Sequence, residues 1–329
     1  MTSLIDKTPE AEAWLDSERE ALSSLSAYGR IQDAVLWTGE LTDAGVPIVD
    51  IDPQKLVDEI NSRGMPLLFG HDPSAPRGRV LAARLFKSPS EVPFVAAIIG
   101  LYTAANCLSF EGLGATTLIA RSPPELLPML PPQTSFSIAT DPREVDEAWV
   151  SDVATSSPFP VERVEMSHNA AEAATELIRL ALPYVVLVWN PFVTEIAKAA
   201  GKDVYAGVRD WLRTVVAKVS KRSNPILAID ATQDGCQVTF ILRGNNVNEH
   251  YAALGQLAEA AVQAAQLITH LKESGLVPRT LVYEFDTGAA RWAPANAILE
   301  DGRLVTSKAT LIAIEQAPMG LSIGMSRTP

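Results

Sequence analysis

Apolar and polar residues follow two different spacings along this chain, one in its first half and another in its second. In the first half, short alternating or continuous apolar runs predict strands that are separated by turns. A polar stretch rich in Ala, Glu and Leu, residues 9–25, is expected to form a helix before them. The predicted strands cover residues 34–37, 46–51, 65–69, 79–86, 94–102 and 136–140.

One short helix in this first half has clear start and stop signals. Asp52 precedes Pro53, and an acidic capping residue followed by proline is a favoured way to begin a helix. Gly64 is the residue type that commonly ends one. We therefore expect a helix between Asp52 and Gly64, with one apolar face formed by Leu56, Val57 and Ile60.

Longer helical patterns dominate the second half. Residues 170–182 and 204–221 are expected to be helical, and the second of these has a valine-rich stripe. The longest predicted helix covers residues 248–274, where Leu and Ala recur every three or four positions and would allow another helix to approach closely. The remaining predicted elements are strands at 238–242 and 281–285 and a hairpin that joins 297–299 to 304–306 through Asp301-Gly302.

Together these patterns predict an α+β protein of two domains, as a length of 329 residues also suggests. Five prolines within residues 122–132 require a rigid loop, and the Ser-Ser-Pro-Phe-Pro run at 156–160 is the expected boundary. We expect residues 1–160 to form a mostly antiparallel, barrel-like β domain with short helices. Residues 161–329 are expected to form an α+β partner-binding or regulatory domain, with long helices and a small antiparallel sheet.

Acidic residues are concentrated in the first half of the chain. Residues 1–160 contain 11 Lys and Arg against 22 Asp and Glu, a net charge of −11, which leaves only −1 of the total −12 for the rest. An acidic surface repels a phosphate backbone, so nucleic acid is not expected as a partner. We expect a protein or peptide partner instead, and the seam in residues 248–274 also suggests a homo-oligomer.

Several other features argue against particular classes of protein. Cys107 and Cys236 are too few and too far apart for a disulfide framework or a zinc site, and we expect neither a metal nor another cofactor. The first 22 residues lack the basic and apolar regions of a signal peptide. The most apolar run, residues 180–189, is too short to cross a membrane. A cytoplasmic location is therefore expected.

One segment carries a resemblance to a known family. Residues 65–80 read MPLLFGHDPSAPRGRV, so that an apolar strand ends in His-Asp and a Pro-x-Gly-x-Val step follows. This pattern resembles the histidine region of the caudoviral prohead proteases, capsid-maturation peptidases related to the herpesvirus assemblins. The matching positions are His71, Asp72, Pro76, Gly78 and Val80.

The resemblance implies further catalytic residues downstream. The family places its nucleophile in an apolar-Ser-Ile-Gly pattern, which Ser137 and Ile138 match, although Ala139 replaces the glycine. Residues 144–155 look like the family's strand with the third, acidic residue, here Asp152, and His168 is the alternative for that role. His71 would then take the proton of Ser137, and the third residue would orient and stabilise the imidazole.

Other interpretations of these residues remain open. Gly320-Leu-Ser322-Ile-Gly324 copies the serine motif more closely but lies out of the family's order, so Ser322 is the reserve nucleophile. Ser109 lies in a glycine-rich stretch without the nucleophile-elbow pattern, which indicates a turn. His71, Ser137 and Asp152 also have ordinary structural explanations. Two functions are therefore expected as alternatives: a serine peptidase that processes a phage-related partner, or a non-catalytic sensor, adaptor or assembly protein on a degenerate peptidase-like scaffold.

Overall fold

A computed structural model provides the structure of the chain. It describes residues 4–22, 24–41, 45, 51–69, 72–115, 133–168, 176–188, 202–307, 310 and 322–327. Residues 46–50 of the strand predicted at 46–51, the proline-rich loop at 122–132, and His71 lie outside these ranges.

The chain divides into two compact units. Unit 1 consists of Met1–Cys107 and Leu311–Gly324, and unit 2 consists of Leu108–Thr310 and Met325–Pro329. This division differs from the expected one, because residues 156–160 lie inside unit 2. They connect the helix Glu147–Thr155 to the strand Val161–His168, and both of these elements belong to unit 2. A Pro- and Ser-rich run marks a loop, but only long-range contacts decide whether a loop separates two cores.

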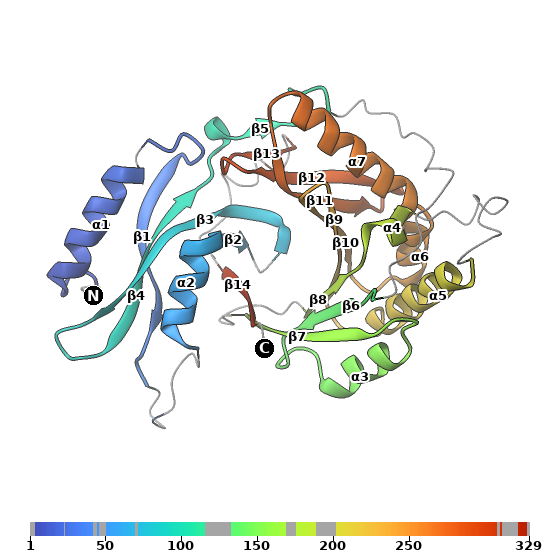
Figure 1. The fold of residues 1–329 in the computed structure, drawn as a ribbon, viewed down its shortest axis with the longest axis horizontal. Helices are drawn as coiled ribbons and strands as arrows, with labels where there is room; N and C mark the ends of the chain where they lie inside the picture. Colours follow the sequence, from blue (N-terminus) through green and yellow to red (C-terminus); the bar gives the residue numbers. More distant parts are fainter. Residues whose placement is uncertain are drawn as a thin grey trace. The chain divides into compact units, whose positions relative to one another are not determined.

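Unit 1 contains an antiparallel sheet. Its strands are ordered β1 (Arg30–Thr38), β4 (Pro93–Leu101), β3 (Asp72–Lys87) and β2 (Met65–Phe69), and β14 (Ser322–Arg327) pairs with β2 through residues 322 and 323. The expected antiparallel strands are thus confirmed at 65–69 and 79–86. The expected barrel is wrong for the described strands, which form an open sheet (Figure 1).

Two helices accompany this sheet. In α1 (Pro9–Leu22), Ala11 and Leu15 pack with the buried Phe94 and Ile98 of β4. The second helix, α2 (Pro53–Arg63), begins and ends as expected: the Asp52 carboxylate accepts a hydrogen bond from the backbone N–H of residue 54 at 2.9 Å, and Gly64 has a φ of +62°. A short 3-10 helix, η1 (Ala104–Asn106), follows β4.

Unit 2 is built on a large mixed sheet rather than the small antiparallel sheet expected. Parallel pairs are β7/β6, β8/β9, β10/β11 and β13/β5, and antiparallel pairs lie between them. The strand order is β7 (Val161–His168), β6 (Phe136–Thr140), β8 (Glu176–Ala181), β9 (Pro225–Gln233), β10 (Cys236–Arg243), β11 (Pro278–Asp286), β12 (Arg291–Leu299), β13 (Leu304–Thr306) and β5 (Leu108–Ser109).

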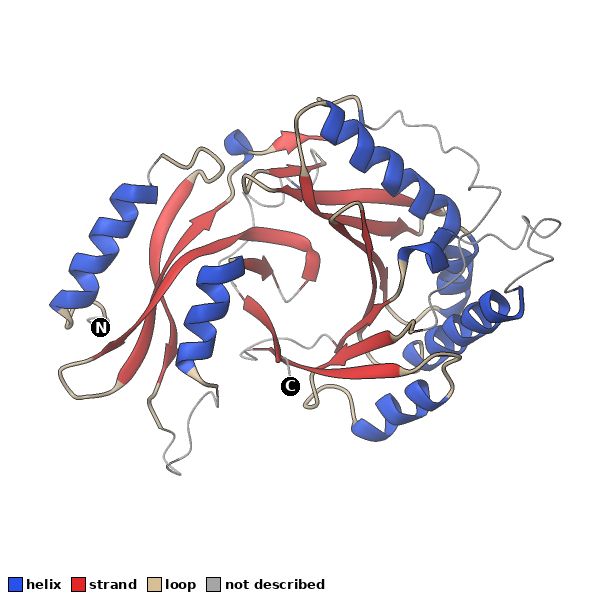
Figure 2. Cartoon of the chain, in the orientation of Figure 1, coloured by secondary structure: helices blue, strands red, loops and turns tan. Residues whose placement is uncertain are grey.

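The helices of unit 2 cover one face of this sheet, as Figure 2 shows. They are α3 (Glu147–Thr155), α4 (Tyr184–Val188), α5 (Lys202–Val219), α6 (Val247–Gly255) and α7 (Leu257–Glu273). Val215, Ile268 and Leu271 from the helices pack with Phe240 and Leu281 from the strands in the main core. We call this the helix side of the sheet, and the other face the strand side; Met166, Leu177, Ile226, Ala228, Ile241 and Val282 form a second apolar cluster there.

Three predicted elements that lie in unit 2 are corrected. Residues 147–155 form a helix rather than a strand, because Asp146 caps it and Val150 and Val153 recur at helical spacing. Within the range 170–182, residues 176–181 form β8, whose apolar residues face both sides of the sheet and so lack a strand's alternation. The helix expected at 248–274 is two helices, separated at Gln256.

The apolar seam of that helical region packs within unit 2. Leu257, Ala261, Ala264, Ile268 and Leu271 are all at most 4% exposed. The seam therefore belongs to the core of unit 2. No described helix is long and apolar enough to cross a membrane.

Candidate functional site

The expected nucleophile and the expected acid lie on opposite faces of the unit 2 sheet. In β6, Phe136 and Ile138 point to the helix side, so the alternation of a strand places Ser137 and Ala139 on the strand side, where Ala139 packs with the second apolar cluster. Asp152 belongs to α3, which packs on the helix side through Val150 and Val153. The sheet itself separates the Ser137 hydroxyl from the Asp152 carboxylate.

Asp152 has a structural role instead. Its side chain is 68% exposed and forms an ion pair of 2.5 Å with Lys218 of α5. The pair links two helices of the same layer near the protein surface. Ser137, which lies opposite Ala181 in the neighbouring β8, makes no side-chain hydrogen bond with the residues that are described.

The segment around His71 has local structural reasons for its residues. The Asp72 carboxylate accepts hydrogen bonds from the backbone N–H of Ser74 at 2.9 Å and from its hydroxyl at 3.0 Å, at the start of β3. A Cβ atom on Gly78 would lie 2.0 Å from the carbonyl oxygen of Gly100 in the next strand. The motif's glycine is therefore required by the close approach of two strands, whether or not the protein is an enzyme.

The alternative site residues, Ser109, His168 and Ser322, lie on three different strands. Ser109 marks a turn, as expected, because its hydroxyl accepts a hydrogen bond of 2.9 Å from the backbone N–H of Gly112. His168 is the last residue of β7. Ser322 opens β14 and lies in register with Leu68 of β2, three positions before His71. The reserve nucleophile thus lies on the strand that pairs with β2.

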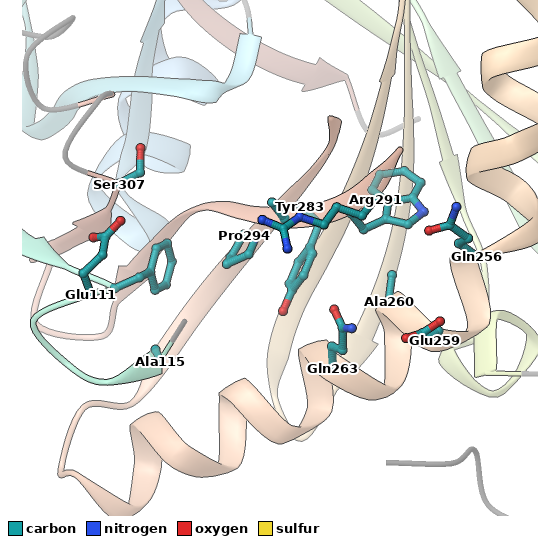
Figure 3. A pocket seen from close by; sticks show the side chains of 13 residues that line it. Glu111, Ala115, Gln256, Glu259, Ala260, Gln263, Tyr283, Arg291, Pro294 and Ser307 are labelled. Carbon is teal, nitrogen blue, oxygen red and sulfur yellow. The ribbon is translucent and has the colours of Figure 1, made fainter. Parts of the chain in front are cut away.

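A cavity of about 480 Å³ lies within unit 2, between α7, β11, β12 and the segment that follows β5 (Figure 3). This volume falls in the range of sites that bind small molecules. Its small residues Ala115, Ala260 and Ala293 leave the space open. The other lining residues are Phe110, Glu111, Gln256, Glu259, Gln263, Tyr283, Arg291, Trp292, Pro294 and Ser307.

Tyr283 of β11 is the buried polar residue of this cavity. Its side chain is 2% exposed, yet its hydroxyl has no hydrogen-bond partner among the described residues. Figure 3 shows that hydroxyl pointing into the cavity, towards Gln263. Burial raises the pKa of Tyr283 above its usual range, and the nearby Tyr184 raises it further, so the hydroxyl stays protonated and is able to donate a hydrogen bond.

The charged side chains around the cavity also lack protein partners. Glu111, Glu259 and Arg291 form no ion pair or side-chain hydrogen bond with the described part of the chain. Other arginines of unit 2 are engaged: Arg179 makes two hydrogen bonds to the buried Asp230, and Arg243 pairs with Glu284. All three residues are exposed, so their charged groups remain open to solvent and to a bound molecule.

Hydrogen bonds hold the walls of the cavity in place. The Trp292 indole donates to the carbonyl oxygen of Ala253 at 3.0 Å, and its ring packs edge-on against Phe240. Gln256 donates to the carbonyl oxygen of Ala290 at 2.8 Å. On the opposite wall, His270 Nε2 lies 3.0 Å from the carbonyl oxygen of residue 113. Lining side chains such as Trp292 and Gln256 are therefore held in place by backbone groups that do not line the cavity, and the site is preformed.

Sequence reasoning missed this cavity, because its residues come from separate segments. Glu259 and Gln263 are four residues apart on α7, so both face the same way, but a polar pair at this spacing is common on exposed helices. The sequence predicted a strand at 281–285, which includes Tyr283, but gave this residue no functional role. The one available signal was a tyrosine in a strand that is otherwise apolar on its buried face.

The arrangement offers hydrogen-bonding groups and charges of both signs. Among the described residues, no three His, Cys, Asp or Glu side chains gather where they could hold a metal ion. No family model, curated protein or solved structure matches the chain. Its class is therefore defined by architecture alone, as an α+β protein with a mixed sheet and a preformed cavity in unit 2.

Proposed function

We propose that this protein is a non-catalytic sensor, and that the cavity of unit 2 is its small-molecule site. The observation that carries the proposal is Tyr283, a buried residue whose protonated hydroxyl points into a space of about 480 Å³ and has no described protein partner. The hydroxyl opens onto the cavity that Tyr283 lines, so a bound molecule can reach it. A tyrosine hydroxyl can donate one hydrogen bond to such a molecule and accept another from it.

The uncommitted charges support the same proposal. Glu259 and Arg291 surround the cavity without satisfying one another, although opposite charges elsewhere in unit 2 are paired. Polar groups that converge on a largely preformed, partly aromatic cavity are the usual signature of a ligand site. The residues described around it include no activated nucleophile, which favours binding over chemistry.

Native mass spectrometry of the freshly purified full-length chain tests this function. We expect a small-molecule adduct that is released when the protein unfolds. Ala293→Trp places an indole in the cavity and is expected to abolish the adduct. Ala289→Trp is the matched control, because this exposed residue lies in the same hairpin but does not line the cavity. An adduct that Ala293→Trp leaves unchanged would contradict the proposal.

A serine peptidase centred on His71 and Ser322 is the second candidate function. It is favoured by the strand register, in which Ser322 lies opposite Leu68. His71 follows Leu68 by three residues in the sequence.

A fluorophosphonate probe separates this candidate from the first. If unit 1 is a peptidase, the probe labels the wild-type protein, and both Ser322→Ala and His71→Ala abolish the label. Ser137→Ala is the control and should label normally, because Ser137 lies on a different strand in unit 2. Absence of labelling in the wild-type protein would eliminate the peptidase and leave the sensor.

A further inference from the structure

We infer that the ligand of this cavity is a free amino acid or a close analogue, a zwitterion that carries an ammonium and a carboxylate group. The inference rests on the proposed binding function and specifies its ligand. It depends on three features of the lining: uncommitted charges of both signs, a protonated hydroxyl at the base, and an apolar wall. Each feature restricts the chemistry of the molecule that fits.

The charges around the cavity disfavour a phosphate group. Glu111 and Glu259 contribute two negative charges, and Arg291 contributes one positive charge, so the lining has a net charge of −1. A dianionic phosphate would meet one cation and two anions. A zwitterion instead offers one group for each sign, because its carboxylate can bind a guanidinium while its ammonium binds a carboxylate.

Arg291 is the group expected to bind the ligand's carboxylate. A guanidinium presents a planar fork of N–H donors, which matches the two oxygens of a carboxylate. Figure 3 shows the Arg291 side chain extended across the cavity from β12, over Pro294. Within the described structure it pairs with no acidic residue, unlike Arg179 of β8 and Arg243 of β10. Its hydrogen-bonding capacity is therefore available to a ligand.

Glu259, Gln263 and Tyr283 are the groups expected to bind the ammonium. An ammonium donates three hydrogen bonds and accepts none, so it requires several acceptors. Glu259 supplies a carboxylate, and Gln263, one helical turn later on α7, supplies an amide oxygen. The Tyr283 hydroxyl points towards Gln263 in Figure 3 and can accept the third bond.

The rest of the lining suits an apolar side chain. Phe110, Trp292 and Pro294 present apolar groups to the same space. Phe110 and Trp292 are at most 5% exposed, so a ligand side chain placed against them would leave water. An aromatic or branched aliphatic amino acid therefore satisfies the charged and the apolar parts of the cavity together.

Isothermal titration calorimetry on the full-length protein tests the inference with five named probes: L-phenylalanine, phenethylamine, 3-phenylpropionate, adenosine and AMP. Phenethylamine lacks the carboxylate, and 3-phenylpropionate lacks the ammonium. We expect L-phenylalanine to bind at least about tenfold more tightly than either analogue, since each loses one charge-assisted contact. Adenosine and AMP are expected not to bind.

Two charge-neutralising variants assign the contacts. Arg291→Gln is expected to weaken the binding of L-phenylalanine by about tenfold and to leave the affinity for phenethylamine unchanged. Glu259→Gln should weaken the binding of both compounds and leave the affinity for 3-phenylpropionate unchanged. Arg303→Gln is the matched control, because Arg303 pairs with Asp301 in the next hairpin and does not line the cavity. It should bind all probes as the wild-type protein does.

The failures of the inference and of the proposed function have different signatures. Equal affinities for L-phenylalanine and its two analogues would overturn the inference that the ligand is a zwitterion. Binding of adenosine or AMP that Ala293→Trp abolishes would also overturn it, while the cavity would remain a ligand site. If none of the five probes binds and native mass spectrometry finds no adduct, both the inference and the proposed function are wrong.

Discussion

Replacing Tyr283 with phenylalanine is expected to leave the ligand-free protein as stable as the wild type or more stable. A buried tyrosine hydroxyl usually contributes about 0.5–1.5 kcal/mol through its hydrogen bond. The Tyr283 hydroxyl has no such bond within the described structure, so its removal breaks no hydrogen bond to the protein and makes a residue that is 2% exposed less polar. The expected change in the free energy of unfolding lies between zero and about 1 kcal/mol of stabilisation.

Tyr184 provides the matched comparison in the same core. Its hydroxyl donates a hydrogen bond to the carbonyl oxygen of Ala261 on α7. Tyr184→Phe removes that bond and is expected to destabilise the protein by about 1 kcal/mol. For a unit of roughly 200 residues, this corresponds to a loss of about 2–4 °C in Tm. The two substitutions delete the same atom, yet should shift stability in opposite directions.

The assay is thermal unfolding of protein that has been unfolded, dialysed and refolded to remove any bound molecule. Tyr283→Phe should unfold at the wild-type temperature or above it, and Tyr184→Phe below it. Should Tyr283→Phe lower Tm as much as Tyr184→Phe does, the Tyr283 hydroxyl has a protein partner, and the main argument for a ligand site fails. With a bound ligand, the wild-type protein should gain stability that Tyr283→Phe lacks.

Three further predictions concern local features of the structure. Asp52→Ala removes the cap of α2 and should lower the free energy of unfolding by about 1 kcal/mol in chemical denaturation. Asp52→Asn can still cap the helix, so it should keep most of that stability in the same measurement. Gly78→Ala places a Cβ atom against the backbone of Gly100 and should cost about 3 kcal/mol; a loss below about 1 kcal/mol would show that the strands separate easily. Burial raises the pKa of the Cys107 thiol to about 11, so iodoacetamide at pH 8 should modify it about 100-fold more slowly than a thiol of pKa 9. The rate should rise as the pH approaches 11, and a plateau near pH 9 would contradict the effect of burial.

Some elements followed directly from local signals in the sequence. The helix α2 begins at Pro53 and is capped by Asp52, since a short carboxylate satisfies backbone donors within its own turn. The hairpin at Asp301-Gly302 also formed as expected, with Ala297 opposite Val305. In both cases the deciding interactions span only a few residues, and the sequence pattern contains all of them.

Other elements depended on distant partners. Residues 176–181 form an interior strand because β6 and β9 provide hydrogen-bonding partners on both sides, and an interior strand buried on both faces does not alternate. A short apolar run of this kind does not distinguish a strand from a helix. The same limit applies to Ser137: its motif was visible, but the face of the sheet to which it points depended on the packing of α3 and α5.

The sequence by itself determined the α+β class, the helices with local caps, and most strands of unit 1, because short-range hydrogen bonds and apolar periodicity specify these features. The tertiary structure alone decided the domain division, the mixed sheet and the candidate site. Tyr283, Glu259 and Arg291 become neighbours of one cavity only when β11, α7 and β12 pack together. A ligand site of this kind is a property of long-range packing, so no single stretch of residues announces it.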